Sequence, residues 1–185
     1  AGDGAVWVTL PALDRVLRRA ADGTLREFAL PPGAEPTGVA AAADGAVWVV
    51  ERRGNRVVRI SADGAVSAWA IESPNAQPDA IVVAGDGSVW FTLPNAFRIG
   101  RVSPEGVLRE YTVENAPLGI SVGADGGVWF GSPASKRVGR LDPSNGKVSW
   151  RKVPETPIAL AVASDGVVWV VLGAGDRIAR IPGKG

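Results

Sequence analysis

The chain has 185 residues, 46% of them hydrophobic, and its 20 basic and 19 acidic side chains leave a formal net charge of +1. A chain of this length can bury a substantial core, no apolar run reaches the roughly 18 residues that a bilayer requires, and the balanced charge disfavours nucleic acid or an anionic membrane as partner. The sequence contains no cysteine and no histidine, which excludes disulfides, thiolate chemistry and histidine-based catalysis or metal binding within these residues.

One pattern recurs five times, in steps of 41, 42, 39 and 40 residues. Each copy has an Asp-Gly pair, a Trp four residues after the Asp, and two Arg residues 8 and 11 positions after the Trp. A Pro stands 12 residues before the last four of these Trp residues. Residues that recur at constant spacing, here called anchors, predict repeated structural units. The anchors are Asp3, Asp44, Asp86, Asp125 and Asp165; Trp7, Trp48, Trp90, Trp129 and Trp169; Arg15, Arg56, Arg98, Arg137 and Arg177; and Arg18, Arg59, Arg101, Arg140 and Arg180.

Taken in chain order, the second unit predicts four short strands. A small apolar run at 39–42 leads through an Asp-Gly turn into a β-branched and aromatic run at 47–51. A polar loop at 52–55, a mixed run at 56–60, a second Asp-Gly turn and a last run at 66–71 follow. Asp-Gly between alternating apolar runs is a strong hairpin signal, and no segment shows sustained helical periodicity. Four strands in about 40 residues are typical of a β-propeller blade.

The chain is out of phase with whole blades, because it begins on a second strand at 6–9 and ends on a third strand at 177–181. The predicted fold is therefore an all-β propeller of four-stranded antiparallel blades, about five in number, with the first and last incomplete and 18 strands in all. The predicted units of this one domain (1–185) are 1–31, 32–73, 74–114, 115–154 and 155–185. We favour a ring that closes as five blades over part of a larger ring, since an open end would expose an apolar face and a strand edge that invite association.

The repeated Trp and Arg residues have structural interpretations. A Trp at one fixed position in every unit, flanked by apolar residues, indicates packing between blades rather than a stacking platform for a ligand. Trp69 and Trp150, on the predicted outer strands, could instead mark a contact surface. Because the Asp residues recur in the same phase, one Arg of each unit is expected to bind an Asp or turn carbonyls, which suits its planar guanidinium.

Alternation of strand direction places the Asp-Gly turns on one face of the disc and the longer connections on the other. These connections are 10–14, 51–55, 93–97, 132–136 and 173–176, with the links that end at each Pro. On this loop-rich face we expect Thr37, Glu51, Asp79 and Ser132 at the mouth of the channel, able to bind a small molecule or a peptide. Glu51 and Asp79 could also hold Mg²⁺ or Ca²⁺ with loop carbonyls, or could be two solvated carboxylates.

Three motifs together resemble the repeats of the virginiamycin B (streptogramin B) lyase family. They are Pro-x-Gly-Val/Ile, Asp-Gly-x-Val-Trp-Phe-Thr/Gly and Arg-Val/Ile-Gly-Arg-Val/Leu, and they stand out at 86–92 with 98–101 and at 117–120 with 125–130. The resemblance covers the whole chain and implies a propeller, with an extracytoplasmic location favoured. Enzymes similar to it have seven blades, a catalytic histidine and acidic residues that hold magnesium. Only Glu51 here matches the Glu that often follows Trp-Phe-Thr, and no histidine is present, so the resemblance assigns no catalytic residue.

Two functional hypotheses from different classes follow. The first is a non-catalytic binding or scaffold module with no cofactor, natural or engineered, whose open ends could associate with further copies; the lack of Met also fits a processed, excised or designed chain. The second is a divalent-cation-dependent lyase or lactonase that uses Glu51 and Asp79.

Overall fold

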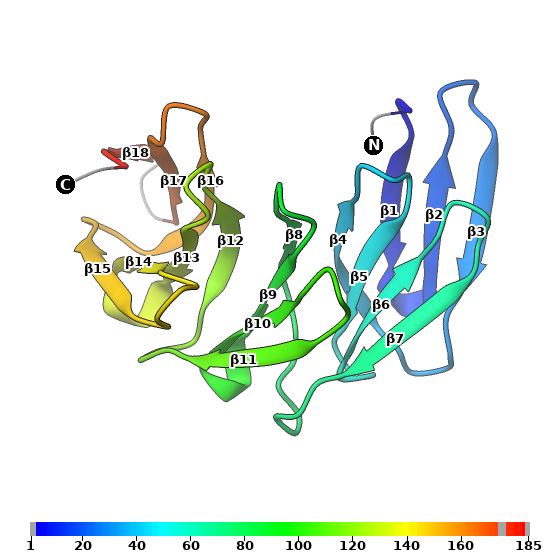
Figure 1. Ribbon diagram of the computed structural model, residues 1–185, viewed down its shortest axis with the longest axis horizontal. Coiled ribbons are helices and arrows are strands. Elements are labelled where there is room, and N and C mark those ends of the chain that lie inside the picture. The colour runs from blue at the N-terminus through cyan, green and yellow to red at the C-terminus, as the bar shows by residue number, and fades with distance from the viewer. Residues whose placement is uncertain (1–2, 174–176, 184–185) are drawn as a thin grey trace.

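The computed structural model describes residues 3–173 and 177–183, and these residues form 18 strands in five antiparallel sheets (Figure 1). The three complete sheets have four strands each, in sequence order. They are β4 (Pro36–Ala41), β5 (Val47–Glu51), β6 (Arg56–Ile60) and β7 (Val66–Ala70); β8 (Ile81–Val83), β9 (Val89–Leu93), β10 (Arg98–Val102) and β11 (Leu108–Thr112); and β12 (Leu118–Val122), β13 (Val128–Ser132), β14 (Arg137–Leu141) and β15 (Val148–Lys152).

The two end sheets have three strands each. The first contains β1 (Val6–Leu10), β2 (Arg15–Arg19) and β3 (Leu25–Ala29), and the last contains β16 (Pro157–Val162), β17 (Val168–Leu172) and β18 (Arg177–Ile181). The helical segments within the described residues are single 3-10 turns at Pro11–Leu13, Pro94–Ala96 and Pro133–Ser135. No helix of the described chain is long and apolar enough to cross a membrane. The predicted all-β propeller with incomplete first and last blades is confirmed.

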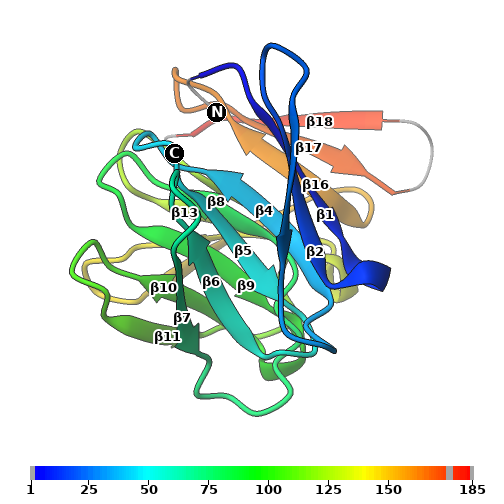
Figure 2. The same ribbon diagram turned by 90° about the vertical axis from the view of Figure 1, so that its right-hand side faces the viewer.

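The sheets follow one another around an arc (Figure 1), and Figure 2 shows the same sheets from the side. From the second sheet to the last, the first strands of neighbouring sheets lie next to each other, β4 beside β8, β8 beside β12 and β12 beside β16. The arc stays open between β1 and β16 (Figure 1). The expected closure as a five-bladed ring is therefore wrong, because the first and last sheets do not pack on one another in the described structure.

Each junction between sheets has its own hydrophobic core, in which the Trp face of one sheet packs on the apolar face of the next. Trp48 packs with Val89 and Phe91, and Trp90 packs with Val128 and Phe130. Trp48, Trp90 and Trp129 are 8%, 2% and 2% exposed. The predicted packing role of Trp is confirmed at these positions, whereas Trp169, which has no following sheet, is 46% exposed.

Side-chain volume is balanced between neighbouring strands within a sheet. Phe91 lies directly opposite Gly100, and a Cβ on residue 100 would approach the Phe91 ring to 2.1 Å. Phe130 and Gly139 repeat this arrangement in the next sheet. In the second sheet the same two positions hold Val49 and Val58. A large residue is thus accommodated where its cross-strand partner has no side chain, which keeps the cores close-packed.

In the first four units the second Arg of the repeat binds the Asp of its own Asp-Gly turn. Arg59 Nη2 lies 2.6 Å from Asp44 Oδ2 and Arg140 Nη2 lies 2.8 Å from Asp125 Oδ2, with a longer pair of 3.5 Å between Arg101 and Asp86. The same Asp side chains accept the backbone N–H two residues ahead. Donation by the Ala46 N–H and by Arg59 holds the pKa of Asp44 below its ordinary value. These arginines therefore close the turns, as predicted.

Candidate functional site

Glu51 ends β5 on the loop-rich face, but its side chain is fully buried. Arg56 on the adjacent strand donates from Nη2 to Glu51 Oε1 at 3.2 Å and from Nε to Oε2 at 2.5 Å. Gly54 covers the carboxylate so closely that a Cβ at this position would come within 2.2 Å of Oε2. Glu51 is therefore the buried half of a bidentate ion pair, and Gly54 is needed for the close approach of the loop.

Asp79 is also paired with an arginine. Its Oδ1 accepts from Arg52 Nη2 at 2.5 Å, and the two side chains are 29% and 37% exposed. Beside it, Thr37 donates its hydroxyl hydrogen to the Pro78 carbonyl at 3.0 Å. The backbone of Gly38 passes so close that a Cβ would lie 2.5 Å from the Asp79 carbonyl oxygen. Thr37 and Asp79 thus lie together where β4 meets β8 on the loop-rich face.

Ser132 lies apart from Thr37 and Asp79 in the fold. It ends β13, two sheets further along the arc than Glu51, and it is buried. Its hydroxyl bonds to the Ser135 hydroxyl at 2.7 Å within the 3-10 turn that follows. The structure therefore brings Thr37 and Asp79 together and keeps Ser132 apart. A cation at Glu51 and Asp79 remains a prediction, and the described residues contain no group of three or more acidic side chains that could hold a metal ion.

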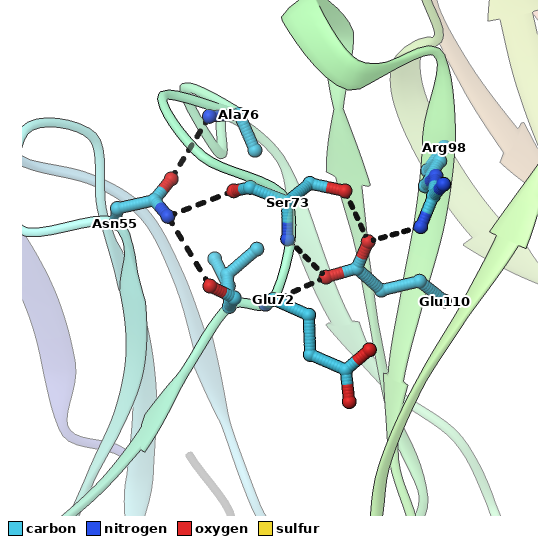
Figure 3. A network of polar contacts seen from close by, with 7 residues as sticks. Asn55, Glu72, Ser73, Ala76, Arg98 and Glu110 are labelled. Atoms are coloured by element: carbon cyan, nitrogen blue, oxygen red, sulfur yellow. Dashed lines mark hydrogen bonds and ion pairs between the residues drawn. The ribbon is translucent and has the colours of Figure 1, made fainter.

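The link between the second and third sheets is held by a network of polar contacts on this face (Figure 3). Asn55 donates from Nδ2 to the carbonyls of Ile71 (3.3 Å) and Ser73 (2.9 Å), and its Oδ1 accepts from the Ala76 N–H at 2.9 Å. Asn55 has a φ of 49°, a left-handed conformation that Asn tolerates well. Asp14, at the same repeat position, holds the preceding link through the N–H groups of Gly33 and Glu35, both at 2.8 Å.

Glu110 on β11 holds the other side of the same link (Figure 3). Its carboxylate accepts from the N–H groups of Glu72 and Ser73 at 2.9 and 3.1 Å, from the Ser73 hydroxyl, and from Arg98 Nη1 at 3.0 Å. Burial acts to raise the pKa of Glu110, but these donors outweigh it and the pKa lies below its ordinary value. The sequence analysis missed Glu110 and Asn55; the Asn or Asp directly before the first Arg of a unit was the available signal for Asn55.

Cavities lie on both faces: one of about 430 Å³ on the loop-rich face is lined by Asp14, Glu35 and Arg53, and three others lie among the Asp-Gly turns of the opposite face. The largest, about 600 Å³, opens between the second and third sheets and is lined by Ala41–Asp44, Trp48, Trp69, Ser103 and Gly106. Cavities of about 420 and 430 Å³ recur in repeat phase at the next two junctions. Because a similar cavity recurs at three successive junctions, blade geometry accounts for it without a ligand.

The outer-strand tryptophans pack against ring neighbours rather than standing free. Trp69 lies 4.9 Å from Trp48 between ring centroids and donates from Nε1 to the Gly106 carbonyl at 2.8 Å. Trp150 meets Phe130 edge-on at 5.5 Å, and the Arg137 guanidinium lies 4.5 Å from its centroid. Both therefore contribute to packing at their junctions; the contact surface suggested for them stays a prediction.

Radial four-stranded sheets with a tryptophan at each junction define this chain as a β-propeller. The model of the virginiamycin B lyase family matches residues 1–185, and the chain belongs to that family. Over its whole length the chain is 30% identical to virginiamycin B lyase from Staphylococcus aureus, with a TM-score of 0.93. It spans 65% of that protein. No curated protein sequence showed a significant match.

Two further solved structures are similar to the chain in fold. A catalytically inactive histidine-to-alanine variant of the Staphylococcus aureus lyase with quinupristin is 27% identical over the whole chain, with a TM-score of 0.83 and 68% of that structure covered. A gluconolactonase from Xanthomonas campestris is 21% identical, with a TM-score of 0.74 over the whole chain and 74% of the relative. At that identity the likeness concerns the fold alone.

Proposed function

We propose that this chain is a non-catalytic propeller module that binds a small molecule or a peptide on its loop-rich face. The observation that carries the proposal is the pairing of both candidate carboxylates with arginine: Glu51 is sealed by Arg56, and Asp79 is bound by Arg52. A general acid or base must reach the proton that it moves; Glu51 is buried in a bidentate pair, and Asp79 carries its arginine on one oxygen, so neither is a free base in this arrangement. The lack of histidine agrees with this, because the related lyase described with quinupristin is inactive as a histidine-to-alanine variant.

The alternative is a divalent-cation-dependent lyase or lactonase. It is supported by membership of the family and by Glu51, which holds the position of the acidic residue in the family motif. In that case Mg²⁺ or Ca²⁺ would displace Arg52 from Asp79 and take oxygen ligands from the loops, as hard cations prefer.

Quinupristin serves as the probe that separates the two. The purified chain is incubated with quinupristin, with and without millimolar Mg²⁺ or Ca²⁺, and the compound is followed by mass spectrometry, with the Staphylococcus aureus lyase as the positive control. We expect no conversion under any condition. Cation-dependent conversion that disappears in Asp79→Asn would overturn the proposal in favour of the enzyme.

Binding is measured in the same samples by calorimetry. We expect quinupristin to bind to the wild-type chain and to bind more weakly to Asp79→Arg, which reverses a charge on the loop-rich face. Glu105→Arg is the matched control, because Glu105 is exposed beside the turns of the opposite face, where its carboxylate accepts the Ser103 hydroxyl hydrogen. Equal weakening in both variants would show that the effect is one of net charge and not of this face.

A further inference from the structure

The outer strand of the second sheet, β7, has a free edge that carries no charge. β6 is its hydrogen-bonded neighbour on one side, and within the described chain no strand pairs with its other side. From Gly64 to Ile71 the sequence contains no charged residue and no proline. The outer strands of the first, third and fourth sheets each carry two charged residues, namely Arg26 and Glu27, Arg109 and Glu110, and Arg151 and Lys152. β7 therefore lacks the charges with which proteins keep other strands away from an exposed edge.

The pairing of β6 with β7 determines which backbone groups lie on this edge. The Ile71 N–H donates to the Asn55 carbonyl at 3.1 Å, and at the other end of the ladder the Ser61 N–H donates to the Ala65 carbonyl at 2.9 Å. Hydrogen-bonded and non-hydrogen-bonded residue pairs alternate along an antiparallel ladder. The odd-numbered residues of β7 therefore bond to β6, and the even-numbered residues direct their N–H and C=O groups outward. These outward-facing residues are Val66, Ala68 and Ala70.

The outward-facing groups fit an extended backbone. All three residues are exposed, and their N–H and C=O groups repeat at about 6.8 Å, the distance between every second residue of a strand. The side chains of Ala68 and Ala70 are small, so they leave room for large apolar side chains on an added strand. An extended peptide that pairs with a free sheet edge gains main-chain hydrogen bonds from the edge and specificity from its alternate side chains.

Acidic residues at both ends of the edge distinguish a peptide from a second copy of the chain. Asp63 and Glu72 are exposed, and the Glu72 side chain points away from the contacts that hold its backbone (Figure 3). Arg26 donates to the Asp63 carbonyl oxygen and so balances part of the charge at that end. Two copies paired antiparallel about Ala68 would place Asp63 of each close to Glu72 of the other, and like charges across strands are unfavourable. A strand with basic ends has the complementary charge.

We propose that the free edge of β7 binds an extended peptide segment of a partner protein by strand addition. The segment carries large apolar side chains at alternate positions and a basic residue near each end. It extends the second sheet from four strands to five, and its backbone bonds to Val66, Ala68 and Ala70. This surface lies at the outer end of the sheet, apart from Thr37 and Asp79, so it is distinct from the site proposed on the loop-rich face.

Calorimetry of the intact chain with a synthetic peptide tests the site. The probe is Lys-Thr-Ile-Thr-Phe-Thr-Ile-Thr-Gly-Lys, blocked at both ends. Paired antiparallel with the Phe opposite Ala68, it places its Ile residues opposite Val66 and Ala70 and its Lys residues opposite Asp63 and Glu72. We expect this peptide to bind. N-methylation of the Phe, whose N–H faces β7, should weaken binding at least tenfold, whereas N-methylation of the Thr that follows, whose N–H faces away, should leave binding unchanged.

Proline substitutions test the edge from the side of the protein. Ala70→Pro removes an outward N–H without breaking a bond to β6, as proline is tolerated at such edge positions, and it should weaken peptide binding at least tenfold. Ala29→Pro is the matched control, because Ala29 holds the same repeat position on β3 and its N–H also faces outward; it should bind the peptide like the wild type. Ala68→Lys replaces Ala70→Pro if circular dichroism shows that the latter does not fold.

Four results would each overturn the proposal. The first is no binding at millimolar peptide, and the second is equal weakening by the two N-methylated peptides. The third is self-association of the chain alone in analytical ultracentrifugation that Ala70→Pro abolishes, which would assign the edge to a second copy. The fourth is loss of peptide binding in Asp79→Arg with Ala70→Pro unaffected, which would place the peptide on the loop-rich face.

Discussion

Trp90 offers the most direct test of the blade packing. It is 2% exposed, and it shares a core with Ile99 of its own sheet and Phe130 of the next. The Tyr111 ring lies 5.5 Å from it between centroids, and the Arg101 guanidinium lies 5.2 Å from its centroid. Burial of about 150–250 Å² at about 25 cal/mol per Å² corresponds to about 4–6 kcal/mol as an upper limit.

We therefore expect Trp90→Ala to lower the free energy of unfolding by about 3–5 kcal/mol, as is usual for the truncation of a buried Trp. Urea denaturation followed by far-ultraviolet circular dichroism measures the change without relying on tryptophan fluorescence. Trp169→Ala is the control at the same repeat position, and since Trp169 is already 46% exposed, we expect a loss below about 1 kcal/mol, measured at submicromolar concentration. Equal losses in the two variants would refute the assignment of Trp90 to an inter-blade core.

Two further predictions concern stability. Gly100→Ala should destabilise the chain by about 1–3 kcal/mol through overpacking against Phe91. In a double-mutant cycle, Phe91→Val should remove most of this added cost, because Val49 and Val58 fit together at the same two positions of the second sheet. Additive losses of unfolding free energy in urea denaturation would contradict this. The pKa of Glu110 is lowered in the folded chain, so its contribution to stability is full above the unfolded pKa of about 4.3 and is lost as the pH falls through the folded value. Urea midpoints measured from pH 7 down to about pH 3 should therefore fall less steeply in Glu110→Gln than in the wild type, and parallel curves would show that the hydrogen bonds seen at Glu110 do not persist in solution.

Local chemistry made most of the strands predictable. The predicted bounds 47–51 and 56–60 coincide with β5 and β6, because an Asp-Gly turn and a polar loop fix both ends of the hairpin. The inner strand β4 begins at Pro36 rather than at the predicted Val39, since the small residues before Val39 carry no alternation to mark it. The arginine partners of the turn aspartates were also foreseeable, because Asp and Arg recur at a constant separation in every repeat.

The candidate site was less predictable, because the role of a carboxylate depends on the side chains and backbone groups that surround it. The sequence places Glu51 and Asp79 near the loop-rich face, but it does not say that Arg56 and Arg52 reach them or that Gly54 covers Glu51. Glu110, which fixes a link from a strand in the following sheet, shows no motif at all. Such contacts join segments far apart in the chain, and their strength depends on burial that composition does not reveal.

The sequence by itself determined the repeat, the strands, the turns and the residues that face each junction, since these follow from side-chain alternation and turn geometry over a few residues. Tertiary structure decided that the sheets form an open arc and that Trp169 and Val8 are exposed while their repeat equivalents are buried. The physical reason is that the angle between neighbouring sheets depends on the volumes packed at every junction, such as Phe91 over Gly100, and its sum around the axis cannot be obtained from any one repeat.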